Sequence, residues 1–356
     1  MRILIVGAGI AGTTLGHHLM ERGVAVKIID KGANHSSAVA AGILNPLVFR
    51  RMTLSWRAET MMPGAALFYR KIEALLQQSF YTPIPIRRLF SSNQEREFWL
   101  KKQTLPVFDH YMKFVDDEDE HFKHHNNTNG TGLVNHSAYV DSEKYMQANW
   151  NYFVEHQILE WDEVKYIDFD VENGLYKGEQ YDHIIFCEGK DNLNNPWFGG
   201  LPIQQTKGEI LTIQTNVINQ HESLNRKCFL LPVGDHQFKV GSTYEWDIDN
   251  IIPTKEGKTT ILENLTSVFD GDYKITNHVA GVRPTVPDRR PILGKHPEFP
   301  KITIANGLGA KGYLLAPLLM QELVEHLLDG KELNLEVKIE RYLKWLHKSR
   351  GVAAKV

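Results

Sequence analysis

Cysteine is almost absent from this sequence: among 356 residues only Cys187 and Cys228 occur. Two cysteines do not make a disulfide framework, and these two do not have the spacing of a cysteine metal site. The sequence also has no apolar run near the roughly 20 residues that a membrane-spanning helix needs. Its first apolar stretch is too short for a secretory signal and runs directly into glycines. We therefore expect a protein of the reducing cytoplasm with no membrane span.

Neither sign of charge dominates the chain, since 40 basic and 43 acidic residues give a net charge of −3. This balance argues against a nucleic-acid or anionic-membrane surface, so no nucleic-acid partner is expected. Three histidines, His121, His124 and His125, lie close together in the polar segment 116–132. They could bind a metal, but the segment is rich in Asn and Gly and shows no pattern of carboxylates placed to support histidine ligands. A solvated loop is the favoured interpretation, and no metal is expected.

The first 31 residues carry the clearest motif of the chain. Residues 2–6 form a short, β-branched apolar run typical of a buried strand, and Gly7, Gly9 and Gly12 follow in G-x-G-x-x-G spacing. A helical pattern comes next, and then a second apolar strand that ends on Asp30. The glycines permit a tight turn, the close approach of a pyrophosphate, and helix–strand packing, while the acid can accept hydrogen bonds from a ribose. This order predicts a dinucleotide site at the helix N-terminus.

Further strand–glycine units occur later in the chain. The strand 181–186 ends in Cys187-Glu188-Gly189, and the strand 302–305 precedes the glycines of NGLGAKG and a helix over 313–328. Between these units, residues 207–244 alternate as antiparallel strands. The pattern predicts an α/β fold in which a discontinuous, Rossmann-like domain is joined to a second, mainly antiparallel β domain.

Four separated segments together resemble the flavin-dependent amine and amino-acid oxidases typified by D-amino-acid oxidase, glycine oxidase and sarcosine oxidase. They are the N-terminal motif through Asp30-Lys31, S-S-x-V-A-A-G ending at Gly42, G-V-R-P-x-x-x-D-x-x-P-I-L-G over 281–294, and G-L-G-A-K-G-Y-L-L-A-P over 307–317. The resemblance implies an FAD-binding domain formed by residues 1–82, 140–200 and 276–356. It implies a substrate domain formed by residues 83–139 and 201–275.

The resemblance also implies which residues contact FAD. In that family the N-terminus of the last long helix stabilises the negative charge of the reduced ring. No cysteine lies near residues 291–311 and no histidine directly precedes Ala40-Ala41-Gly42, so the cofactor should be bound non-covalently. The implied cofactor contacts are Gly7, Gly9, Ile10, Ala11, Gly12, Asp30, Lys31, Ser36, Ser37, Ala41, Gly42, Val164, Gly189, Arg283, Gly307, Gly309, Ala310, Lys311 and Gly312.

Three basic side chains are the implied catalytic residues. Arg283 occupies the position that binds the substrate carboxylate, although a structural ion pair with Asp288 is an alternative. Lys239 resembles by context a lysine that lies over the flavin and helps oxygen react, but a strand lysine can equally face water. Lys311 precedes the last long helix, at a place where relatives carry other groups. Phe229 stands where glycine oxidases use a tyrosine.

The implied reaction is oxidation of the C–N bond of a small amine or amino acid, by hydride transfer to flavin N5. Oxygen or an electron carrier would then accept the electrons. A tRNA-modifying oxidase domain is one alternative, because such domains share the fold and the N-terminal motif. A flavoprotein scaffold or electron-transfer partner without small-molecule turnover is another.

Overall fold

The structure is a computed structural model that describes residues 1–33, 36–115, 125–246, 248 and 250–346. It divides into two compact units. The first unit comprises Met1–Ala38, Glu143–Thr206 and Val282–Val356, and the second comprises Val39–Ser142 and Lys207–Gly281. The expected division into an FAD-binding and a substrate domain stays a prediction. The segment 39–82, expected in the FAD-binding domain, lies in the second compact unit.

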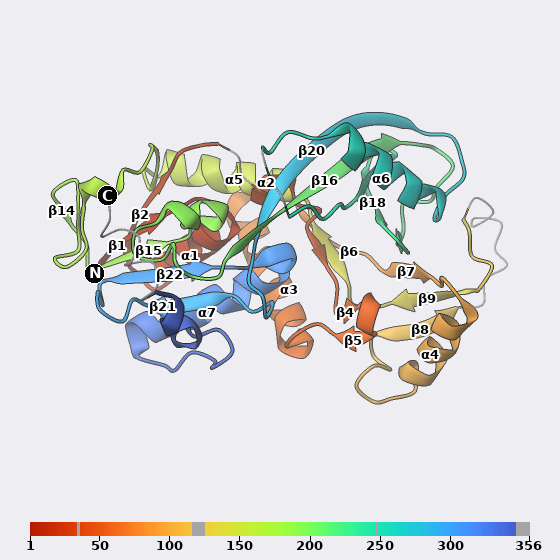
Figure 1. Ribbon diagram of the computed structural model, residues 1–356, viewed down its shortest axis with the longest axis horizontal. Helices are drawn as coiled ribbons and strands as arrows, with labels where there is room; N and C mark the ends of the chain where they lie inside the picture. The colour runs from red at the N-terminus through yellow and green to blue at the C-terminus, as the bar shows by residue number, and fades with distance from the viewer. Residues whose placement is uncertain (34–35, 116–124, 247, 249, 347–356) are drawn as a thin grey trace. The chain divides into compact units, whose positions relative to one another are not determined.

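The first unit is built on the predicted parallel sheet (Figure 1). β1 is flanked by β2 on one side and β15 on the other, and all these strands run parallel. The side chains of Ile3, Leu4 and Ile5 are fully buried, as expected for a strand covered on both faces. Among the described strands of this sheet, only β21 runs antiparallel to its neighbour, which is β22. In spatial order the strands are β11 (Leu159–Trp161), β2 (Ala25–Asp30), β1 (Arg2–Val6), β15 (His183–Phe186), β22 (Ile302–Asn306) and β21 (Ile292–Lys295).

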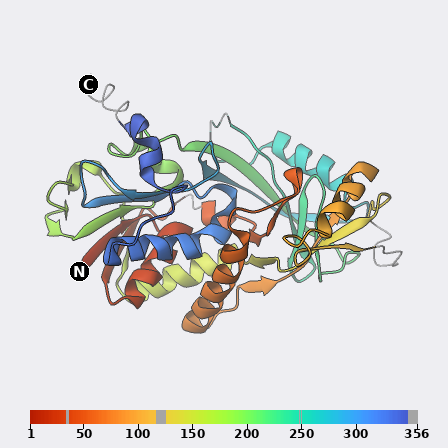
Figure 2. The same ribbon diagram turned by 90° about the horizontal axis from the view of Figure 1, so that it is seen from below.

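Helices of this unit start at the carboxyl ends of the central strands. α1 (Ile10–Glu21) follows β1 and α7 (Gly312–Asp329) follows β22, and the two helices pack against each other (Figure 2). α5 (Ser142–Glu155) precedes β11. A small antiparallel sheet is formed by β12 (Phe169–Asp170), β13 (Leu175–Tyr176) and β14 (Glu179–Gln180). The arrangement brings the N-termini of α1 and α7 to one edge of the sheet.

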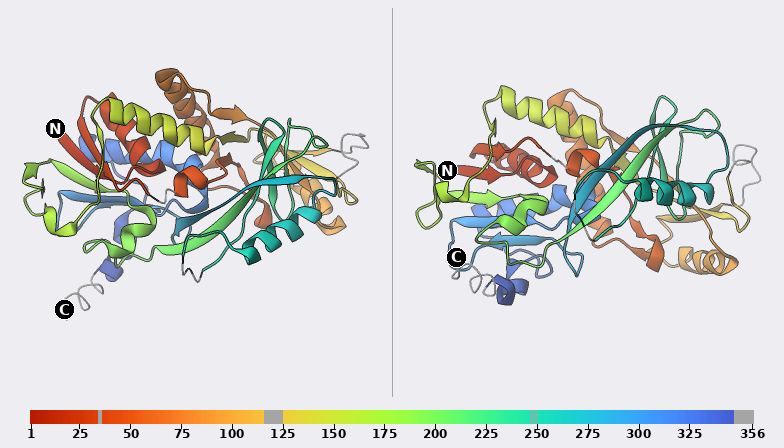
Figure 3. Two further views of the ribbon diagram at one scale, coloured as in Figure 1. Left: turned by 90° about the horizontal axis from the view of Figure 1, so that it is seen from above. Right: turned by 45° about the horizontal axis from the view of Figure 1, so that its top comes forward.

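The second unit is dominated by an eight-stranded sheet that is mainly antiparallel, as predicted. Its long strands β16 and β20 are neighbours at one edge (Figure 3). One parallel pair, β7 with β17, interrupts the antiparallel pattern. In spatial order the strands are β20 (Lys274–Thr285), β16 (Gln204–Gln214), β19 (Gln237–Gly241), β18 (Phe229–Gly234), β17 (Ser223–Asn225), β7 (Ile86–Leu89), β9 (Thr131–Val134) and β8 (Met112–Val115).

The segment 39–82 joins the second unit through strand pairing. Within it, β3 (Ile43–Leu44) and β6 (Tyr81–Pro83) both pair with β10 (Ala138–Val140), and β4 (Leu47–Val48) pairs with β5 (Thr53–Leu54). The pairs with β10 tie the segment to residues 55 to 96 positions later, so local sequence does not reveal them. The remaining helices of the unit are α3 (Ala58–Leu76), α4 (Asn93–Gln103) and α6 (Lys255–Thr266).

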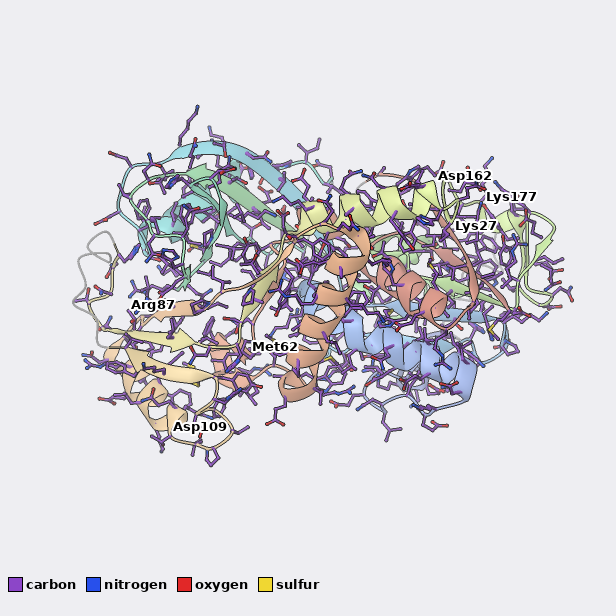
Figure 4. The ribbon with its side chains drawn as sticks, turned by 180° about the vertical axis from the view of Figure 1, so that it is seen from behind. Lys27, Met62, Arg87, Asp109, Asp162 and Lys177 are labelled. Carbon is purple, nitrogen blue, oxygen red and sulfur yellow. The ribbon has the colours of Figure 1, made fainter. Side chains whose placement is uncertain are left out.

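Two buried side chains, both labelled in Figure 4, show how the second unit is held together. Met62 of α3 is buried and fills core space, the usual role of a flexible thioether. Arg87 of β7 is also buried, and its Nε donates a 2.5 Å hydrogen bond to Glu222 while its Nη1 donates to Thr131 of β9. A buried guanidinium needs such partners, and here it links β7 to two neighbouring segments.

Only residues 125–132 of the histidine-rich segment are described, so the expected solvated loop stays a prediction. His121 and His124 lie outside the described residues, whereas His125 is buried and forms an isolated backbone bridge with Phe269. Across the part of the chain that the structure describes, no cluster of His, Cys, Asp or Glu could hold a metal ion. No described helix combines the length and apolar character needed to cross a membrane.

Candidate functional site

The turn between β1 and α1 has the geometry that only glycines allow. Gly7 has φ +108°, a conformation that L-residues rarely adopt. A Cβ on Gly12 would lie 1.9 Å from the Gly7 carbonyl oxygen, so helix and turn are in direct contact there. Gly9 has φ −76°, and a Cβ on it would lie 3.2 Å from Ser37 Oγ. The backbone angles of Gly9 therefore do not require glycine, and the close approach of a pyrophosphate to this residue stays a prediction.

Asp30 lies beside this turn at the end of β2. Its Oδ2 accepts a hydrogen bond from Ala8 N and its Oδ1 accepts one from Gly32 N, both at 2.7 Å. The two bonds fix the carboxylate next to the glycine turn. A carboxylate offers about four acceptor positions, which suits a group predicted also to accept hydrogen bonds from the hydroxyls of a ribose.

The two serines of α2 (Ser36–Val39) have different partners. Ser37 Oγ accepts a 2.9 Å hydrogen bond from Ile10 N, so this hydroxyl sits at the N-terminus of α1. Ser36 Oγ instead accepts from Val282 N at 2.9 Å and links α2 to β20. Of the pair, Ser37 is the one placed at the predicted phosphate position.

The glycines after β22 bring a second helix N-terminus to the same place. Gly307 and Gly309 have φ +79° and +57°, and the turn η5 (Gly309–Lys311) leads directly into α7. A Cβ on Gly312 would lie 3.3 Å from Ile10 Cγ2, and Tyr313 Oη donates a 2.8 Å hydrogen bond to the Ser37 carbonyl. The N-termini of α1 and α7 are therefore neighbours, and their dipoles present two positive ends to one region.

This arrangement fits a dinucleotide that also carries a negatively polarised ring. The glycine cradle excludes side chains, one helix N-terminus suits a pyrophosphate, and the other suits a second negative pole. Ile10 and Ala11 form the first turn of α1, and Ala310 lies in η5. The predicted contacts Gly7 to Gly12, Asp30, Ser37 and Gly307 to Gly312 thus come together in the first unit.

Lys31, Val164 and Gly189 lie on neighbouring parts of the first unit. Lys31 Nζ forms a 2.7 Å ion pair with Asp191. Val164 packs against the hydrophobic core of the sheet, and Gly189 has φ +55° and accepts a 3.0 Å hydrogen bond from Asn306 Nδ2. These positions follow the ends of β2, β11 and β15, where ligands of parallel sheets bind.

Glu188 is a polar group at this edge that the sequence analysis did not single out. Tyr166 Oη and Asn195 Nδ2 each donate a 2.7 Å hydrogen bond to its carboxylate. Burial raises the pKa of the Glu188 carboxyl to about 7, and the two donors only partly offset it. The sequence did contain a signal for it, because Glu188 stands between the end of a strand and Gly189, where ligands of parallel sheets bind.

Replacing Glu188 with glutamine tests this burial. Between pH 4.5 and 7 the folded protein keeps a proton that the unfolded chain releases, so the free energy of unfolding of the parent should fall as pH rises. The slope from this group approaches about 1.4 kcal/mol per pH unit. Glu188→Gln mimics the protonated acid. Its free energy of unfolding relative to the parent, measured with urea, should therefore rise from pH 5 to pH 7.5. Parallel pH profiles of the two proteins would show that Glu188 is not the buried acid described.

Arg283 lies in β20 and is half-buried. The acid considered as its structural partner is engaged elsewhere: Asp288 Oδ2 accepts from Arg341 Nη1, and Oδ1 accepts from Arg290 N at 3.0 Å. Both carboxylate oxygens of Asp288 thus have partners other than Arg283. Binding of a ligand carboxylate by the Arg283 guanidinium stays a prediction.

Lys311 occupies the N-cap position of α7. Burial lowers the pKa of its ammonium to about 8. Removing water from the ammonium costs free energy, and the positive end of the helix dipole repels it. Charged groups held at such a cost are common in functional sites.

Lys239, Ala41 and Gly42 belong to the second unit. Lys239 Nζ donates to the Ala40 carbonyl at 3.4 Å and to Ser142 Oγ at 3.3 Å, while its neighbours Phe238 and Val240 are fully buried on the opposite face. Its ammonium therefore lies against the S-S-x-V-A-A-G segment. Gly42 has φ +74°, and a Cβ on it would lie 1.9 Å from the Val140 carbonyl oxygen.

Comparison with known proteins gives a consistent result. The family described as FAD dependent oxidoreductase (DAO) matches residues 2–326. The glycine oxidase of Bacillus subtilis is 26% identical over 228 residues, which cover 60% of this chain and 56% of that protein. A tRNA 5-methylaminomethyl-2-thiouridine biosynthesis bifunctional protein of Marinobacter nauticus is 22% identical, over 91% of this chain and 55% of that protein. The matched stretches thus span just over half of each of these two relatives.

Among solved structures, the iminodiacetate oxidase of Chelativorans sp. BNC1 superposes with a TM-score of 0.77. The two chains are 21% identical, and the match covers 96% of this chain and 98% of that one. At this identity the likeness establishes the fold: a parallel sheet with helices joined to a separate antiparallel sheet.

Proposed function

Because this chain belongs to the family of FAD-dependent oxidoreductases, we propose that it oxidises the C–N bond of a small amine or amino acid. The observation that carries the proposal is the meeting of the α1 and α7 N-termini over the glycine cradle of the first unit. When bound there, FAD supplies the hydride acceptor, its N5 atom. The relatives named as glycine oxidase and iminodiacetate oxidase support the substrate class.

The first unit supplies the groups that hold the cofactor in this proposal. The α1 N-terminus binds the pyrophosphate, which Gly9 leaves room for, and the Asp30 carboxylate accepts hydrogen bonds from the ribose hydroxyls. The α7 N-terminus supports the negative pole of the ring system. The second unit serves as the substrate domain, with oxygen or an electron carrier as the acceptor. The cytoplasmic location stays a prediction.

Arg283 orients the substrate in the proposed reaction. Its planar guanidinium binds a carboxylate through two parallel hydrogen bonds and stays charged at all relevant pH values. A fixed carboxylate positions the C–H bond that reacts, and most of the rate would come from that positioning.

Changing Arg283 to lysine should weaken substrate binding and turnover together, by ~10–100-fold in kcat/KM, because one of the two hydrogen bonds is lost. The flavin absorbance spectrum should remain almost unchanged. The matched control is Arg289→Lys, a charge-preserving change at an exposed arginine, which should leave kinetics at the parental value. Parental kinetics with a lowered melting temperature in Arg283→Lys would instead identify a structural role.

A second candidate function comes from the tRNA-modifying relative of Marinobacter nauticus. In that case the amine would be carried on a tRNA base. The net charge of −3 favours the small substrate. The two are separated by offering free amino acids and unmodified or aminomethylated tRNA to the enzyme without oxygen. Bleaching of the flavin by tRNA alone, with measurable RNA affinity at low salt, would replace the small-molecule proposal.

A further inference from the structure

A pair of tryptophans lies in the first unit beside the acid that is predicted to bind a ribose. Trp161 ends β11 and pairs in parallel register with Asp30 of β2, so the two side chains lie on the same face of the sheet. Asp162 N continues this ladder with a 2.8 Å hydrogen bond to the Asp30 carbonyl. Trp161 and Asp30 are therefore neighbours at the carboxyl ends of adjacent strands.

The Trp161 indole is held in place by groups that belong to the glycine turn or contact it. A Cβ on Gly32 would lie 3.2 Å from Trp161 Cε3, and Gly32 N donates a hydrogen bond to Asp30 Oδ1. The rings of Trp150 and Trp161 meet edge to face, with centroids 5.7 Å apart. Trp150 Nε1 donates a 2.8 Å hydrogen bond to the Ala8 carbonyl. Although these contacts fix the indole, Trp161 remains 44% exposed.

The order of the strands indicates which part of a dinucleotide would meet this exposed ring. The strands β1, β2 and β11 follow one another in the sheet. In the proposed placement of FAD, the pyrophosphate lies at the end of β1 and the ribose at the end of β2. The base is attached to the ribose on the side opposite the pyrophosphate. The same direction along the sheet leads from Asp30 to the end of β11, where Trp161 lies.

We propose that the Trp161 indole is a platform on which the adenine ring of FAD stacks. An indole offers a large flat π-face, and a purine base stacks well on such a face. Because Gly32 and Trp150 already fix the ring, stacking costs little further ordering of the side chain. This role concerns the affinity for the cofactor and does not depend on the reaction proposed above.

The test compares ligands that share the phosphates of FAD but differ in their base. ADP and UDP carry the same ribose and pyrophosphate with a purine or a smaller pyrimidine, and inorganic pyrophosphate carries neither ribose nor base. Their dissociation constants are measured by calorimetry on the full-length chain without FAD. The affinity for FAD is measured on the loaded enzyme, from the flavin fluorescence released on dilution. The parent should bind ADP more tightly than UDP.

Variants at Trp161 identify the side chain responsible. Trp161→Leu, with Trp161→Gln as a second removal variant, should weaken the binding of FAD and ADP ~10–100-fold, the scale of one base stacked on an aromatic side chain. UDP should lose less, and pyrophosphate should bind as in the parent. Trp161→Phe should keep most of the affinity. The control is Trp345→Leu, the same change at a tryptophan of the first unit that is 46% exposed, which should keep all the parental values.

Three results would overturn the proposal. A parent that binds ADP and UDP equally would do so without any variant. Removal variants with parental affinity for FAD and ADP would show that the exposed face of the indole meets only solvent. Equal losses for ADP, UDP and pyrophosphate, without recovery in Trp161→Phe, would mean that Trp161 only supports the turn around Asp30. None of these measurements needs reduction of the flavin, so failure of the proposed reaction would leave their outcome unchanged.

Discussion

Protein carrying Gly9→Val should purify colourless, without FAD, while remaining folded. The backbone at Gly9 has φ −76°, which valine adopts readily, so the turn itself is not strained. The new Cβ would lie 3.2 Å from Ser37 Oγ, a contact that a small shift of the serine can relieve. The valine methyl groups, however, fill the space through which a pyrophosphate reaches the α1 N-terminus. Absorbance of the purified protein and of the flavin released on denaturation measures the loss.

The neighbouring glycine provides the contrasting variant. In Gly12→Ala the new Cβ would lie 1.9 Å from the Gly7 carbonyl oxygen, so helix and turn must separate and the fold itself should be damaged. Both variants should lose FAD, but only Gly9→Val should keep the melting temperature of the FAD-free parent. A yellow Gly9→Val protein, or one that binds NAD in place of FAD, would contradict the assignment of this cradle.

Replacing Lys239 with methionine should slow reoxidation of the reduced flavin by oxygen about 100-fold, the scale of losing one preorganised charge. Methionine keeps the length and apolar stem of lysine but removes the charge. The Lys239 ammonium is held by Ala40 O and Ser142 Oγ rather than extended into solvent, as a charge that stabilises developing superoxide would require. Reduction of the flavin by substrate should change only modestly. Stopped-flow absorbance follows the two half-reactions separately.

An exposed lysine of the same unit is the control for this substitution. Lys274→Met removes a charge at the start of β20 and should leave both half-reactions at parental rates. Equal reoxidation rates in Lys239→Met and the parent would show that Lys239 has only a structural role, tying β19 to the Ala40 segment.

The parts of the site that could be predicted from sequence are those encoded within a few residues. The strand, glycine triad and helix of residues 2–21 are local, and Gly7 and Gly12 have the steric reasons that the motif implies. The strand–glycine–helix unit around Gly307 and Gly312 was recognised for the same reason.

Contacts between distant segments could not be predicted in this way. The segment 39–82 belongs to the second unit because β3 and β6 pair with β10, and no local pattern encodes that pairing. Asp288 was considered as a partner of Arg283, yet it binds Arg341 from beyond α7. His125 is buried against Phe269 despite its polar surroundings in sequence. Glu188 was overlooked because its donors Tyr166 and Asn195 come from other segments of the chain.

Anaerobic reduction of the bound flavin by a panel of amines and amino acids tests the central claim most directly. Dithionite added at the end confirms that the flavin can be reduced. The account predicts that at least one small amine or amino acid bleaches the flavin, with about one equivalent of imine-derived carbonyl product per FAD, and that Arg283→Lys needs more of any carboxylate-bearing substrate to do so. A flavin that dithionite reduces but that no amine in the panel can reduce would contradict the account.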